Sequence, residues 1–193
     1  DLCCGPGRYT VDLAHKGFEV VGFDLSEHYL GVARNLVQKE GVTAKFIQGD
    51  MRELPWANHF DAVINVSTSF GFFESDTENQ RVLEAVAKVL KPEGVFVLEL
   101  GNRDYYLKNF IAKNWQRLDD GSVLLVQRDF DYLKSRVNSS FEKWHGSEVE
   151  VWSQSWRAYT LAELVKMLGQ ASLVVTNVFG GWNKRTYDVD ASR

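Results

Sequence analysis

The first hundred residues alternate between short apolar runs and segments with helical periodicity. Val, Phe and Ile are concentrated at residues 18–23, 44–48 and 60–66, and residues 95–100 are similar, so each run predicts a strand. The run at 60–66 is nearly continuous, as expected of a strand covered on both faces. Strands that alternate with single helices are typical of a parallel sheet with right-handed crossovers.

Between these runs, apolar side chains recur three and four residues apart, which predicts helices. The predicted helices cover residues 9–15, 27–39, 78–90 and 161–168. Ser26 stands directly before the second helix, where a hydroxyl can cap free backbone N–H groups. Thr77 with Gln80, and Thr160 with Glu163, have the spacing of a capping box, so we expect a helix to begin after each threonine.

The pattern changes after residue 100. Residues 101–157 hold runs in which apolar and polar positions alternate, most clearly at 123–132 and 149–156, with polar turns between them. Such alternation predicts antiparallel strands. Residues 173–179 are apolar again and predict one further strand after the last helix.

A chain of 193 residues can bury a core and fits one domain. We therefore expect a single domain over residues 1–193. Residues 1–100 would form its core, residues 101–157 an antiparallel insertion, and residues 158–193 the return to the core.

Composition narrows the classes of partner. The net charge is −4 and Lys and Arg are not clustered, so we expect no nucleic acid partner. No apolar stretch approaches the roughly 20 residues that span a bilayer, so we expect no membrane partner. Cys3 and Cys4, the two cysteines, are adjacent and poorly placed to pair, and they predict neither a disulfide framework nor a metal site. A cytoplasmic location is the simplest expectation.

The chemistry begins with the segment DLCCGPGR at residues 1–8, which reads as a strand end, a glycine-rich turn and a helix start. Gly5 and Gly7 would let backbone approach a ligand closely, although a plain strand-to-helix turn is an equal alternative. Asp24 ends the second predicted strand, where a carboxylate can accept both ribose hydroxyls of an adenosine ligand. A nicotinamide-dependent dehydrogenase stays open here, but Thr10 stands where GxGxxG has its last glycine.

Three further segments follow in order: Gly-Asp-Met at residues 49–51, Phe-Asp-Ala-Val-Ile-Asn at residues 60–65, and Leu-Lys-Pro-Glu-Gly at residues 90–94. Together with the glycine turn, they resemble the class I S-adenosylmethionine-dependent methyltransferases, in particular those that act on small molecules. The resemblance implies a Rossmann-like α/β fold with a mostly parallel seven-stranded sheet in the order 3-2-1-4-5-7-6. Residues 101–157 would be an antiparallel insertion in that fold.

The resemblance also implies a cofactor, S-adenosyl-L-methionine, and the residues that bind it. These residues are Gly5, Gly7, Asp24, Leu25, Asp50, Met51 and Asn65. The glycines would lie against the methionine portion and Asp24 would bind the ribose. Asp50 would take the adenine amino group, Met51 would pack on the ring, and Asn65 would line the floor near the methionine end.

Cys3 lies next to these positions and departs from the family's pattern, and Asp50, which is one of them, has an alternative interpretation. Cys3 occupies a position where the family usually has its first glycine, and a side chain there would hinder close approach of the backbone to a ligand. Asp50 could instead form an Asx turn with its own backbone.

Aromatic residues dominate the predicted insertion and the segment after the fourth strand. We expect Phe70, Phe72, Trp152 and Trp156 to line a pocket for a small-molecule acceptor, and the alternative is that they cover a small sheet. Trp152 and Trp156 would share one strand face. His145 is the candidate for a catalytic base, while the other histidines fit solvated or capping positions.

Methyl transfer from a sulfonium is an in-line displacement, so the protein mainly aligns the reactants, which is worth roughly 7–11 kcal/mol. A base is needed only if the acceptor is a hydroxyl or a protonated amine. Two other classes stay open: a nucleotide-dependent dehydrogenase, and a binding protein that keeps the adenosyl pocket without turnover. A homodimer is also open.

The seven-strand order predicts more chain than the sequence contains. The first strand would already end at residues 1–2, although a central strand is paired on both sides. Residues 173–179 would be the sixth strand, and no chain remains after Arg193 to form the seventh. We expect the native protein to extend beyond both ends of this sequence, with the first and last strands incomplete here.

Overall fold

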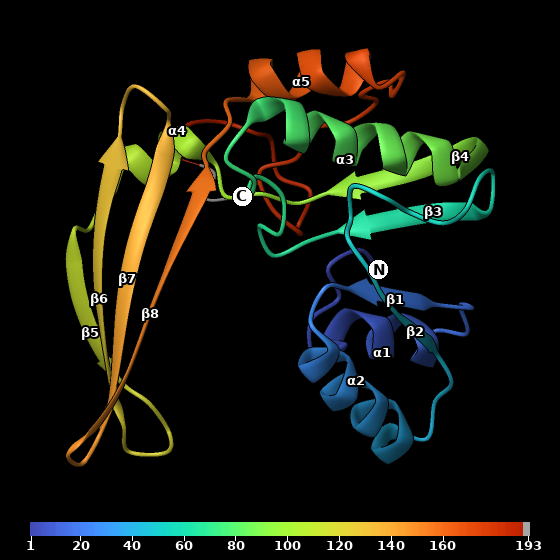
Figure 1. Ribbon diagram of the computed structural model, residues 1–193. Helices are drawn as coiled ribbons and strands as arrows, with labels where there is room; N and C mark the ends of the chain where they lie inside the picture. Colours follow the sequence, from blue (N-terminus) through green and yellow to red (C-terminus); the bar gives the residue numbers. More distant parts are fainter. Residues whose placement is uncertain (191–193) are drawn as a thin grey trace. The chain divides into compact units, whose positions relative to one another are not determined.

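The computed structural model describes residues 1–190, which form two compact units (Figure 1). The first unit comprises residues 1–70, 77–100 and 166–175, and the second comprises residues 71–76, 101–165 and the chain from residue 176. The first unit contains the predicted cofactor residues, and the second contains most of the predicted insertion.

Two pairs of parallel strands build the first unit. The pairs are β1 (Val21–Asp24) with β2 (Lys45–Gln48), and β3 (Phe60–Asn65) with β4 (Leu90–Leu98). Residues 1–4 lie between the pairs: the Cys4 N–H donates to the Phe23 carbonyl over 3.1 Å, and the Leu2 N–H donates to the Ile64 carbonyl over 2.8 Å. These bonds place all five segments side by side, with residues 1–4 in the centre.

The predicted strand at residues 173–179 is wrong. Residues 173–178 form no strand, and Phe179 makes a single bridge, to Thr186. The physical reason is that no segment within residues 1–190 pairs with residues 173–178, and apolar character alone does not make a strand. The complete order of seven strands therefore stays a prediction.

Strand boundaries differ from the prediction at two further places, and the burial of a strand differs at a third. β1 begins at Val21 rather than at Phe18, whose side chain is exposed. β4 begins at Leu90, before the expected turn, with a register shift opposite β3 and a positive φ at Glu93. The first half of β3 is exposed at Asp61 and Ala62, so only its second half is a buried strand.

The sequence predicted capping residues for three helices, and the structure confirms two of these predictions. The four predicted helices are α1 (Arg8–His15), α2 (Glu27–Glu40), α3 (Asp76–Val89) and α5 (Leu161–Gln170). The Tyr29 N–H donates to the Ser26 hydroxyl, and Thr160 and Glu163 exchange both bonds of a capping box, so these predictions are confirmed. The third is wrong: α3 begins at Asp76, before Thr77, and Gln80 instead donates its side-chain amide to the Met167 carbonyl on α5.

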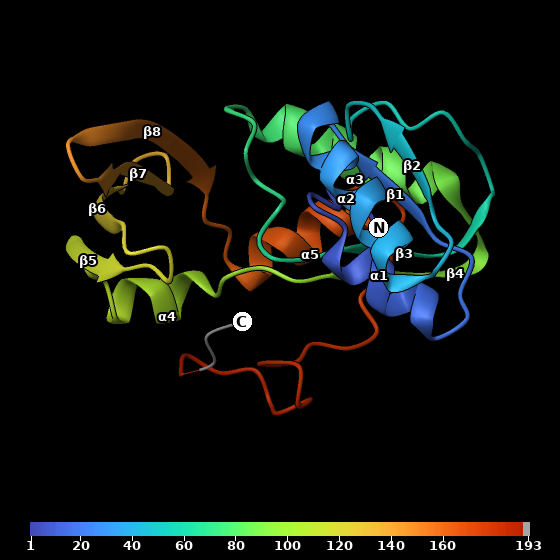
Figure 2. The ribbon, with the colours of Figure 1, turned by 90° about the horizontal axis from the view of Figure 1, so that it is seen from below.

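The second unit is built on an antiparallel sheet in the order β5-β6-β7-β8 (Figure 2). Its strands are β5 (Lys113–Arg117), β6 (Val123–Asp131), β7 (Arg136–His145) and β8 (Glu148–Arg157). β6 and β8 coincide with the two predicted runs. The sequence did not predict α4 (Arg103–Lys108), which Asn102 caps by accepting from the Asp104 and Tyr105 N–H groups.

The register of this sheet fixes which side chains share a face. Trp152 lies opposite Phe141, and Trp156 lies opposite Val137. Because alternate residues point to one side, Trp152 and Trp156 share a face, as predicted. α4 contributes to the same face, since the Tyr106 ring packs edge-on against Trp156 at 5.6 Å.

No helix in the described part of the chain is long and apolar enough to cross a membrane.

The inner face of α3 is the most buried helical surface of the first unit. Val82, Leu83, Val86 and Val89 have at most 1% of their surface exposed. We expect Leu83→Ala to lower the free energy of unfolding by about 2–5 kcal/mol, because it removes buried methyl groups and leaves a cavity. Chemical denaturation measures the change. Glu84→Ala, on the exposed side of the same helix, is the control and should change stability by less than about 0.5 kcal/mol.

Candidate cofactor site

The glycine turn connects residues 1–4 to α1 through backbone that L-residues rarely adopt. Its φ angles are 52° at Gly5 and 83° at Gly7. A Cβ at Gly5 would meet no atom within 4 Å, whereas a Cβ at Gly7 would lie 2.7 Å from the Ala33 Cβ on α2. Gly5 therefore leaves open surface that a ligand can approach, while Gly7 allows α2 to pack against the turn.

Cys3 takes a glycine-like conformation, with a φ of 59°. A residue with a side chain in this region destabilises the fold by roughly 1–2 kcal/mol. Cys3 therefore keeps the backbone conformation of the family's glycine but lowers the stability of the folded state. The Cys3 thiol donates to the Met51 thioether, with 3.4 Å between the sulfurs. Burial raises the pKa of the Cys3 thiol to about 12, and the Asp24 and Asp50 carboxylates act in the same direction. The thiol is therefore protonated at neutral pH.

The Asp24 carboxylate lies at the end of β1 and accepts from two backbone groups. The Gly5 N–H donates to Oδ2 over 2.8 Å, and the Ser26 N–H donates to Oδ1 over 2.9 Å. These two bonds fix the carboxylate between the glycine turn and the start of α2. A carboxylate has about four acceptor positions, so both oxygens can still accept from a ligand.

Asp50 follows β2 and forms the Asx turn that was the alternative for this residue. The Arg52 N–H donates to Asp50 Oδ1 over 2.9 Å. The Arg52 guanidinium also binds both oxygens, with Nε at 3.0 and 3.1 Å, and reaches Glu78 on α3. Hydrogen bonds from the Arg52 side chain lower the pKa of Asp50 below its ordinary value.

Asn65 ends β3 and has 1% of its surface exposed. Its Nδ2 donates to the Leu2 carbonyl over 3.0 Å, whereas its Oδ1 is buried and has no hydrogen-bond partner within residues 1–190. A buried acceptor without a donor is costly, so this oxygen is suited to a donor from a bound molecule.

Thr10 stands where the fingerprint of a nicotinamide-dependent dehydrogenase would have its last glycine. Its side chain is fully buried, and its hydroxyl donates to the Asp1 carboxylate over 2.6 Å. A dinucleotide fingerprint needs a glycine here for close packing of helix and strand. Thr10 fills this place with a bonded side chain, so the dinucleotide fingerprint is incomplete here.

These side chains come together at the carboxyl ends of parallel strands, where α/β proteins bind nucleotides. The donor and acceptor chemistry fits S-adenosyl-L-methionine. The Asp24 and Asp50 carboxylates suit ribose hydroxyls and an amino group, the Asn65 oxygen suits an ammonium donor, and Gly5 leaves space for the ligand. Leu25, next to Asp24, is 69% exposed and so accessible to a ligand.

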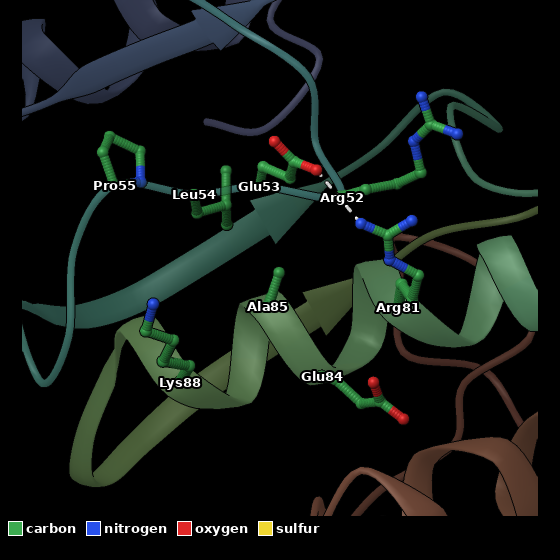
Figure 3. Close-up of a pocket in the computed structure, with 8 residues that line it drawn as sticks. All are labelled: Arg52, Glu53, Leu54, Pro55, Arg81, Glu84, Ala85 and Lys88. Carbon is green, nitrogen blue, oxygen red and sulfur yellow. Dashed lines mark hydrogen bonds and ion pairs between the residues drawn. The ribbon is translucent and has the colours of Figure 1, made fainter.

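A hollow of about 450 Å³ lies beside this group of residues (Figure 3). Its lining residues are Arg52, Glu53, Leu54, Pro55, Arg81, Glu84, Ala85 and Lys88. None of the seven predicted cofactor residues lines it, so we do not assign it to the cofactor.

The structure does not bring all of the predicted acceptor residues together. Phe70 is 1% exposed and therefore packs in the core of the first unit rather than facing an acceptor. Phe72 is 43% exposed, and Trp152 stacks on Phe141 with the ring planes within 4° of parallel. His145 lies at the end of β7 opposite Glu148, roughly 26 Å along the sheet from the row of Trp156, so these two cannot line one small pocket.

Two polar residues near these groups were not predicted from the sequence. Arg52 could have been found, because an Asx turn at Asp50 places the residue two positions later against the carboxylate. Tyr106 could not, since its hydroxyl becomes buried only when α4 packs on the sheet.

The fold and the site define an α/β protein whose polar side chains gather at the carboxyl edge of its parallel strands. Residues 1–94 match the methyltransferase domain family. A structure with a similar fold is an S-adenosylmethionine-dependent methyltransferase from Clostridium acetobutylicum, with a TM-score of 0.84 and 22% identity, over 97% of this chain and 77% of that one. The chain therefore carries a methyltransferase domain over residues 1–94, and its similarity to S-adenosylmethionine-dependent methyltransferases makes it an enzyme whose cofactor is S-adenosyl-L-methionine.

Two curated relatives illustrate the similarity in sequence. YqeM of Bacillus subtilis, a protein named as a methyltransferase, is 29% identical over 87% of this chain and 70% of its own length. The dTDP-3-amino-3,4,6-trideoxy-alpha-D-glucopyranose N,N-dimethyltransferase of Streptomyces venezuelae is 28% identical over 78% of this chain and 58% of its own. The chain spans less than half the length of two further bacterial relatives.

The two glycines of the turn give a matched pair of variants. Gly5→Ala adds a methyl group in open space, so we expect a loss of about 1–2 kcal/mol from the left-handed backbone alone. Gly7→Ala has the same backbone cost and also collides with Ala33, which adds about 1–3 kcal/mol. Urea denaturation of the two variants checks this order. Equal losses would mean that α2 does not pack on the turn as closely as described.

Proposed function

We propose that this protein transfers the methyl group of S-adenosyl-L-methionine to a small-molecule acceptor. The observation that carries the proposal is the group of Asp24, Asp50, Met51 and Asn65 beside the open surface of Gly5. The family supports the reaction class, and the amino-sugar dimethyltransferase among the relatives supports a small acceptor.

In this proposal each residue contacts one part of the cofactor. Asp24 accepts from the ribose hydroxyls, Asp50 accepts from the adenine amino group, and Met51 packs on the adenine ring. The unpartnered Asn65 oxygen accepts from the ammonium of the methionine portion. Gly5, Gly7 and Leu25 complete the walls of the site.

The cofactor, when bound, supplies a methyl group already activated on a sulfonium sulfur. The chain therefore needs to hold donor and acceptor in line and to exclude water. Residues that fix the donor are rigid here, because the Asp24 carboxylate and the Asn65 amide are each held by backbone hydrogen bonds. We assign no general base, and the position of His145 at a hairpin end makes it a poor candidate.

Asp24 tests the cofactor site. Hydrogen bonds to an ionised acceptor are worth about 1.5–3 kcal/mol each, so losing two should weaken binding of S-adenosylmethionine about a hundredfold or more in Asp24→Ala. Titration calorimetry measures the affinity. The control is Asp61→Ala, which removes an exposed carboxylate of β3 that pairs with Lys91 and should leave the affinity unchanged.

Asp24→Ala also removes two bonds that hold the turn, so its thermal unfolding must be recorded beside the binding data. If it unfolds, Asp24→Asn keeps one acceptor oxygen, and we expect about tenfold weaker binding. A folded Asp24→Ala with the affinity of the parent would disprove the ribose assignment.

We further propose that the acceptor binds on the face of the antiparallel sheet that carries Trp152 and Trp156, with Phe72 as a second apolar contact. Aromatic surface with a few polar groups is the usual lining of a small-molecule site. The exposed side chains of Trp152 and Phe72 support this assignment. The two reduced, adjacent thiols fit a cytoplasmic location, and a homodimer stays a prediction.

A methyl-release assay over a panel of amines, hydroxyl compounds and amino sugars identifies the acceptor. For the best acceptor, Trp156→Ala should raise KM by about tenfold or more through lost aromatic contact area, while the affinity for S-adenosylhomocysteine stays within about twofold. Trp115→Ala is the matched control, because Trp115 is an exposed tryptophan on the opposite face of the same sheet. A change in cofactor affinity with an unchanged acceptor KM would contradict the assignment.

A further inference from the structure

We propose that Arg52 is a positioning residue, which fixes the orientation of the Asp50 carboxylate so that the site selects an amino group at position 6 of the purine. This inference rests on the proposed contact between Asp50 and the adenine amino group. It assigns to Arg52 a role in cofactor recognition without direct contact to the cofactor.

The geometry around Asp50 leaves its carboxylate little freedom. Arg52 Nε lies 3.0 Å from Oδ1 and 3.1 Å from Oδ2, and a terminal guanidinium nitrogen also donates to Oδ2. The Arg52 backbone N–H donates to Oδ1 over 2.9 Å. Rotation of the carboxylate would break several of these bonds at once, so the plane of Asp50 is fixed by the plane of the guanidinium.

Glu78 fixes the guanidinium in turn. The second terminal nitrogen of Arg52 donates to Glu78 Oε1, and Glu78 belongs to α3. The side chains of Arg52, Asp50 and Glu78 are 26%, 28% and 35% exposed. These partly buried bonds therefore connect the segment after β2 to a rigid helix, and solvent competes with them only in part.

A fixed carboxylate discriminates better than a mobile one. Arg52 donates three N–H groups to a carboxylate that has about four acceptor positions. An amino group placed against the remaining position replaces the water lost on binding, whereas a purine with hydrogen at position 6 leaves that position without a donor. Sites built to bind a substrate N–H reject analogues without it for this reason. If the carboxylate could turn freely, it would reach other donors or water, and the discrimination would fall.

Arg81 provides a control that distinguishes the orientation of the Asp50 carboxylate from the effect of a nearby positive charge. Its positive charge also lowers the pKa of Asp50, but its guanidinium pairs with Glu53 over 3.1 Å. Figure 3 shows Arg81 turned toward Glu53, while the guanidinium of Arg52 points away from both. Arg81→Ala therefore removes a neighbouring charge and leaves the bonds between Arg52 and Asp50 in place.

The experiment compares two ligands by titration calorimetry. One is S-adenosylhomocysteine, and the other is its analogue with hydrogen in place of the 6-amino group. For the parent protein we expect the amino compound to bind about tenfold more tightly or better, as for a hydrogen bond to a charged acceptor. Arg52→Ala should reduce this ratio to about threefold or less, and Glu78→Gln should reduce it by a smaller factor, whereas Arg81→Ala should keep the parent ratio.

The outcomes separate the inference from the function on which it rests. A parent that binds neither compound would disprove the proposed function, and a parent that binds both equally would disprove the Asp50 contact and this inference with it. If the parent discriminates and folded Arg52→Ala keeps the full ratio, the positioning role is wrong. An equal fall in Arg81→Ala would show that charge, rather than geometry, sets the preference and would also overturn it. If Arg52→Ala does not fold, Glu78→Gln with an unchanged ratio is the overturning result.

Discussion

The site depends on the bonds that the Asp24 carboxylate accepts from Gly5 and Ser26. Those residues belong to the two turns that follow neighbouring strands, so one side chain holds together the start of α1 and the start of α2. The packing of α2 on Gly7 is a second constraint on the same turn, since no side chain larger than hydrogen fits against Ala33. A residue expected to serve the ligand therefore also shapes the structure that receives the ligand.

Local sequence patterns predicted the parts of the fold that local forces determine. The caps at Ser26 and Thr160 are contacts within a few residues, and both formed as expected. The failures involve partners far away in the chain. Gln80 donates to Met167 instead of capping its own helix, and residues 173–178 lack the paired edge that a strand requires. Neither outcome can be read from spacing alone.

The same distinction applies to the candidate site. The predicted cofactor residues follow strand ends at characteristic spacings, so motifs in the sequence were sufficient to propose them, and the fold gathers Asp24, Asp50 and Asn65. Acceptor residues have no such spacing, because they depend on how an antiparallel sheet and α4 pack. Burial removed Phe70 from that set, and strand register separated His145 from Trp156.

The raised pKa of Cys3 has a chemical consequence for a protein that handles a methyl donor. A thiolate is a strong nucleophile, and one beside a sulfonium would compete with the true acceptor and alkylate the enzyme itself. Burial and the nearby carboxylates keep this sulfur in its protonated, weakly nucleophilic form, and its proton is directed toward the Met51 thioether. The cysteine at this glycine position of the turn is therefore held as a thiol rather than as a thiolate.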